Sequence, residues 1–94
     1  MPYIMPKDRE QLDPIIQELS KIIKNIAKEY NYDGAFAGIL NYTCTTLVLQ
    51  VLPARRYWVI ALVTGVLENI KQEFYRRYAA PYEDEQIIKN GDCY

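Results

Sequence analysis

The clearest pattern in the chain is an apolar stripe in its first third, which predicts an amphipathic helix. Proline at the first helical position loses no hydrogen bond and aspartate caps free amides, so Asp13-Pro14 suits the start of this helix. The pattern does not decide whether residues 7–12 form a preceding helical turn. The prolines within residues 1–7 predict an extended arm. The stripe follows three- and four-residue spacing and consists of Leu12, Ile15, Ile16, Leu19, Ile22, Ile23, Ile26 and Tyr30.

A second helix is predicted over residues 35–52, after a turn that contains Asn31, Asp33 and Gly34. This segment is rich in β-branched residues, which also suit a strand. Its length exceeds that of a usual strand, and its apolar positions stay near one helical side. We therefore expect a helix that is mostly buried.

A third helix is predicted within residues 55–80. Its first half is apolar on nearly every side, and its second half is amphipathic, with an ion pair expected between Glu73 and Arg77. After it, residues 81–94 predict a short helix and tail, in which Pro81 lies in the first turn and Gly91 closes the last. We expect Glu83, Asp84 and Glu85 to complement the positive N-terminus of this helix. The stripe of the third helix consists of Ile60, Val63, Leu67, Ile70, Phe74 and Tyr78.

These elements predict one all-α domain over residues 1–94, a small bundle of three main helices plus a short C-terminal helix. The segments 35–52 and 57–67 both require apolar cover on most sides. A bundle of this size hides few positions completely. We therefore expect a homodimer, in which the partner subunit completes the bundle.

Composition and charge narrow the classes of function. Eleven basic and twelve acidic residues leave the chain without the positive field that holds a polyanion, which disfavours nucleic-acid binding. The chain has no histidine, which excludes Ser-His and Cys-His nucleophiles. Two cysteines cannot form the disulfide framework of a secreted domain, which favours the cytoplasm. Polar residues interrupt the uncharged run 34–54, which favours a buried core helix over membrane association.

Both ends of the chain carry idiosyncratic motifs. They are MPYI, Pro6, Arg9 and LDP-II near the start, ILNY at 39–42, and GVLENIKQEFYRRYAAPYEDEQIIKNGD towards the end. In these motifs the chain resembles a small uncharacterised family of short proteins associated with phages and prokaryotes. The segment 43–60 carries little of the likeness. The resemblance implies a grouping and no activity.

Acidic residues are the candidates for a metal site, because hard cations take oxygen ligands and need no histidine. They suggest a magnesium-dependent nucleotide hydrolase that resembles the all-α NTP pyrophosphatases. Those enzymes carry acidic pairs one helical turn apart, whereas Glu68 and Glu73 are five residues apart and point in different directions. The motif therefore fails to map. The candidate metal ligands are Glu68, Glu73, Glu83, Asp84 and, less directly, Asp92.

Aromatic residues near the C-terminal end predict an interface, since tyrosine favours surfaces where one edge is dry and the hydroxyl is wet. We expect a non-enzymatic protein-interaction or regulatory module with no cofactor, acting as a homodimer or on another protein. The alternative is the magnesium-dependent hydrolase. A third hypothesis, nucleic-acid binding through Arg55-Arg56 and Arg76-Arg77, is least favoured. The predicted interface residues are Trp58, Phe74, Tyr75, Tyr78 and Tyr82.

Overall fold

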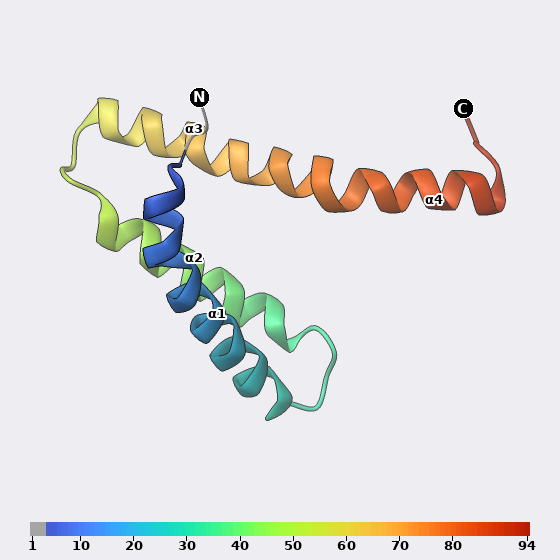
Figure 1. Ribbon diagram of the computed structural model, residues 1–94, viewed down its shortest axis with the longest axis horizontal. Helices are drawn as coiled ribbons and strands as arrows, with labels where there is room; N and C mark the ends of the chain where they lie inside the picture. The colour runs from blue at the N-terminus through green and yellow to red at the C-terminus, as the bar shows by residue number, and fades with distance from the viewer. Residues whose placement is uncertain (1–3) are drawn as a thin grey trace. The chain divides into compact units, whose positions relative to one another are not determined.

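The computed structural model describes residues 4–94 and contains helices and no strand within that range (Figure 1). The chain divides into two compact units, Met1–Val51 and Leu52–Tyr94. The predicted all-α fold is confirmed. The organisation of residues 1–94 as a single domain stays a prediction. No helix in the described part of the chain combines the length and hydropathy needed to cross a membrane.

The first unit holds α1 (Pro6–Lys28) and α2 (Ala35–Val51). Met5 has extended backbone angles, and its carbonyl accepts hydrogen bonds from the amides of Asp8 and Arg9 at 3.0 and 3.1 Å. Pro6 can begin the helix because the first helical amide has no partner within the helix. The helix therefore starts well before Pro14.

Two sequence predictions change at this end of the chain. Pro14 lies inside α1, so the start predicted at Asp13-Pro14 is wrong, and the turn left open over residues 7–12 is helical. The predicted extended arm is two residues too long, because Pro6 and Lys7 belong to α1. The part of the arm over residues 1–3 lies outside the described residues.

Helices α1 and α2 pack against each other as a hairpin (Figure 1). A loop joins them, and the amide of Ala35 donates to the Tyr32 carbonyl at 3.3 Å where α2 begins. Ala35 is buried, with 4% of its surface exposed. The half-buried residues along the hairpin are Leu19, Ile23, Ile26 and Ala27 of α1 and Ile39, Thr43, Thr46 and Val48 of α2.

The helix predicted over residues 35–52 is confirmed, although its β-branched residues also suit a strand. The expectation that it is mostly buried is wrong, because Ala35 is its one buried residue. Thr43 shows how the helix accommodates β-branched residues, since its hydroxyl donates to the Ile39 carbonyl one turn earlier at 2.8 Å. This bond satisfies the polar group of a β-branched side chain within the helix. Length and one-sided apolar spacing therefore decide the secondary structure here.

The second unit is one continuous helix in three parts (Figure 1): α3 (Tyr57–Phe74), the π-helical turn η1 (Tyr75–Ala79) and α4 (Ala80–Asn90). In η1 the amide of Ala80 donates to the Tyr75 carbonyl, five residues back. Pro81 has no amide hydrogen, and its ring would clash with the carbonyl four residues earlier in a regular α-helix. The wider π turn accommodates the proline without breaking the helix.

Because α4 continues directly from η1, its first turn differs from that of a separate helix. Pro81 lies in the first turn of α4 as predicted, and Gly91 closes the helix with φ of 88° and an amide bond of 2.8 Å to the Ile87 carbonyl. However, α4 continues from η1 and has no free N-terminus. The predicted role of Glu83, Asp84 and Glu85 in complementing a positive helix end is therefore wrong, because preceding turns use those amides.

Candidate functional site

The candidate metal ligands of α3 are engaged with neighbours on the same helix. Glu68 lies 3.6 Å from the Lys71 ammonium group and accepts a hydrogen bond from the Gln72 side-chain amide at 3.3 Å. All three side chains are exposed. The contacts have the three- and four-residue spacing of ordinary helix-surface pairs, each of which stabilises a helix only slightly.

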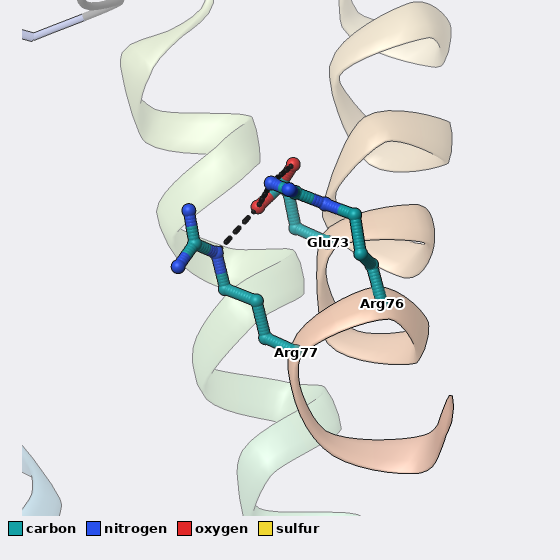
Figure 2. Close-up of polar contacts among 3 residues, drawn as sticks. All are labelled: Glu73, Arg76 and Arg77. Atoms are coloured by element: carbon teal, nitrogen blue, oxygen red, sulfur yellow. Dashed lines mark hydrogen bonds and ion pairs between the residues drawn. The ribbon is translucent and has the colours of Figure 1, made fainter. Parts of the chain in front are cut away.

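Glu73 lies between two arginines (Figure 2). Arg76 donates from one nitrogen to both carboxylate oxygens at 2.8 and 2.9 Å, and Arg77 donates from Nε to Oε2 at 2.8 Å. The predicted Glu73–Arg77 ion pair is thus confirmed. Hydrogen bonds from Arg77 and then Arg76, with their positive charges, lower the pKa of the Glu73 carboxyl. Glu73 therefore stays ionised to lower pH than an unpaired glutamate.

Glu83 acts electrostatically on the phenol of Tyr75, across the π turn. The hydrogen bond to the Glu83 carboxylate, followed by its negative charge, raises the pKa of Tyr75, and the charge of Asp84 contributes in the same direction. This contact was missed by sequence reasoning, because residues eight apart do not face the same side of a regular α-helix. The signal for it was Pro81, which favours a local change of helix geometry.

The candidate metal ligands do not come together as one group of carboxylates. Glu68 and Glu73 have different basic partners, Glu83 faces Tyr75, and Asp92 accepts the backbone amide of Tyr94 at 3.0 Å. Within residues 4–94, no three acidic or cysteine side chains are grouped as a metal ion would require. The arrangement offers local ion pairing on one helix.

The predicted interface residues all lie on the second unit, and all are exposed. Trp58 is near the start of α3, Phe74 ends it, and the tyrosines follow in η1 and α4. Their exposed fractions range from 53% for Tyr75 to 72% for Tyr78. The rings of Phe74 and Tyr78 stack, with centroids 5.5 Å apart and planes inclined by 20°. The structure therefore brings at least this pair into direct contact.

The apolar row predicted on the third helix extends beyond α3 in the structure. Tyr82 joins it, because η1 adds one residue to the turn between Phe74 and Tyr82. We call the complete row the α3–α4 stripe. Six of its members are exposed and Val63 is half-buried. The α3–α4 stripe consists of Ile60, Val63, Leu67, Ile70, Phe74, Tyr78 and Tyr82.

Comparisons with known proteins agree with the resemblance of the terminal motifs. No curated protein and no solved structure matches the chain. A family model does match, and it extends over residues 1–93, which is nearly the whole sequence. Its description gives no activity, in agreement with what the resemblance implied. The chain therefore belongs to the family described as a domain of unknown function, DUF6899.

Proposed function

We propose that this chain is a non-enzymatic interaction module that acts as a homodimer in the cytoplasm. The observation that carries the proposal is that the second unit consists of a single helix with an exposed apolar row. Ile60, Ile70 and Phe74 expose 55%, 58% and 61% of their surfaces. Nothing within the same unit lies beside this helix to cover them. A single amphipathic helix gains little stability in water without apolar cover, and we infer that a partner covers this row.

The chemistry of the exposed residues supports an interaction function. Tyrosine, tryptophan and arginine are enriched among the residues that dominate the binding energy of protein interfaces. Tyr75, Tyr78 and Tyr82 are exposed over η1 and α4, and Arg76 and Arg77 stand between them. Each tyrosine offers a large apolar ring together with a hydroxyl that stays hydrated at the edge of a contact.

The contacts of the acidic residues favour interaction over magnesium-dependent hydrolysis. A carboxylate that binds magnesium must exchange its present partners for the cation. Glu73 already accepts hydrogen bonds from two guanidinium groups, and Glu68 is paired with Lys71. These contacts neutralise the charge that a cation would need. We therefore assign the acidic side chains to local stabilisation of the helix surface.

A thermal-unfolding series separates the two functions. For a homodimer, the melting temperature rises with chain concentration, because association stabilises the folded state by mass action. We expect this rise, and we expect no further rise when magnesium and a panel of nucleoside triphosphates are added. A melting temperature that is independent of concentration would contradict the proposal. A rise caused only by magnesium with a nucleotide would replace it with the hydrolase.

A further inference from the structure

The α3–α4 stripe follows a seven-residue repeat once the π turn is taken into account. From Ile60 to Phe74 the steps are three, four, three and four residues, as at the a and d positions of a coiled coil. The next two steps, to Tyr78 and Tyr82, are four residues each. In a regular α-helix, two such steps would turn the row by about 80°. Phe74 and Tyr82 are eight residues apart. Because the π turn between them contains one extra residue, they lie on the same face, as residues seven apart do in a heptad repeat.

One interaction across the π turn agrees with this alignment. Tyr75 and Glu83 are also eight residues apart, and the Glu83 carboxylate raises the pKa of the Tyr75 phenol across the turn. The Phe74 and Tyr78 rings stack across the start of the π turn. The stack has the four-residue spacing of an ordinary helical pair, so the Tyr75–Glu83 interaction is the one that supports a continuous face from α3 into α4.

We propose that the α3–α4 stripe is the seam along which a second copy of this chain docks, and that the π turn at Pro81 maintains the seam. The inference rests on the proposed homodimer and specifies its contact surface. A row of a and d residues packs best into the holes of another helix with the same repeat. In α1, Leu19, Ile23 and Ile26 are half-buried along the hairpin with α2, whereas Leu12, Ile15 and Ile22 stay exposed. The α3–α4 helix of a second copy offers the same repeat over the same length as the stripe, which makes it the matching partner that we propose.

The exposed area of the stripe agrees with a dimer interface. Its six exposed members leave between 47% and 72% of their surfaces uncovered. At about 200 Å² for an aromatic side chain and somewhat less for an aliphatic one, the stripe offers roughly 600 Å². A standard specific interface buries about 800 Å² on each partner, and atoms that flank the stripe can supply the remainder. The row from Ile60 to Tyr82 is about 33 Å long, at 1.5 Å per residue.

Charge substitutions test the position of the seam. Ile70→Lys places an ammonium group in the stripe, and we expect it to raise the dissociation constant about 30-fold or more, as for a central interface residue. Ile88→Lys is the matched control on the same helix, since Ile88 is 87% exposed and lies outside the stripe. We expect it to leave the dissociation constant unchanged. Circular dichroism at 222 nm checks that both variants remain helical.

A third variant separates failure of the seam from failure of the homodimer. Ile15→Lys changes an exposed residue of α1 and should leave association intact. A wild-type chain that does not associate would overturn the proposed homodimer itself. If the wild type associates, but Ile15→Lys dissociates it and Ile70→Lys does not, the homodimer stands and the α3–α4 seam is wrong.

Pro81→Ala tests the role of the π turn. Alanine restores the amide and removes the ring, so the helix can relax to regular α geometry. Tyr78 and Tyr82 would then rotate out of line with Phe74. We expect the dissociation constant to rise by about tenfold or more, because two aromatic side chains would leave the interface. The helix content should stay equal or increase. Unchanged association with increased helicity would overturn this role of the π turn.

Discussion

Phe74 and Tyr78 stack with their ring centroids 5.5 Å apart, although both rings are exposed. The pair lies where α3 passes into the π turn, and it joins the aliphatic part of the α3–α4 stripe to the tyrosine part. A stacked pair of this kind adds about 0.5–1.5 kcal/mol beyond its area burial. We therefore expect truncation of either ring to weaken the stripe.

Truncation of Tyr78 should weaken association. We expect Tyr78→Ala to cost about 2 kcal/mol of association free energy, because the ring is lost from both the stack and the proposed seam. Tyr94→Ala is the control, since Tyr94 is fully exposed at the chain end, and its effect should stay within about 0.5 kcal/mol. Isothermal dilution calorimetry measures both values. Equal effects of the two substitutions would be inconsistent with this account.

The Glu73 contacts predict a dependence of stability on acid. The two arginines lower the pKa of Glu73 below its usual value of 4.5. The folded state binds this proton less readily than the unfolded state, so the contribution to stability is present above pH 4.5 and is lost as the pH falls through the folded pKa. The denaturation midpoint is measured at a series of pH values. In Glu73→Gln, the part of its fall at acid pH that is due to Glu73 should be absent. The contribution is small because the pair is exposed. An unchanged pH profile in the variant would contradict it.

The Tyr75–Glu83 contact predicts a change at alkaline pH. Glu83 raises the pKa of the Tyr75 phenol above its usual value of 10.0. The stabilising contribution is present below pH 10.0 and is lost as the pH rises through the folded pKa. In a ring-labelled chain observed by NMR, Tyr75 should ionise at higher pH than Tyr94, and Glu83→Gln should move it back towards the usual value. Tyr75→Phe assigns the resonance. A titration unaffected by Glu83→Gln would remove the evidence that the π turn aligns these residues.

The same substitution at two glycines should have opposite effects on stability. Gly38 lies inside α2, and a Cβ atom there meets no described atom within 4 Å. Gly38→Ala should therefore raise the free energy of unfolding by about 0.5–1 kcal/mol through helix propensity. Gly91 has φ of 88°, so Gly91→Ala should lower it by about 1 kcal/mol. Chemical denaturation measures the free energy of unfolding of both variants. A change of the same sign in both would show that local backbone geometry does not decide the effect of the substitution.

The helices were largely predictable from local spacing. The turn at Asn31–Gly34, the helix over residues 35–52 and the Glu73–Arg77 pair all depend on residues within one or two turns of one another. The start of α1 was misplaced because both Pro6 and Pro14 satisfy the same local rule for a first helical position. Sequence pattern alone could not decide between two prolines that each suit the same position.

The candidate site was predictable only up to the π turn. The stripe from Ile60 to Tyr78 could be traced from its spacing, and Pro81 was correctly placed in the first turn of the last helix. The pattern assumed a constant number of residues per turn, so it could not bring Tyr82 into the stripe or Glu83 to Tyr75. A one-residue insertion changes which side chains share a face for the remainder of the helix.

The most direct test of the central claim is the molar mass of the full chain by light scattering coupled to size-exclusion chromatography, at several micromolar concentrations. We expect a mass of twice 11.0 kDa at the higher concentrations, falling towards that of a single chain on dilution. A mass of 11.0 kDa at every concentration would contradict the proposed homodimer, because no second copy would then cover the α3–α4 stripe.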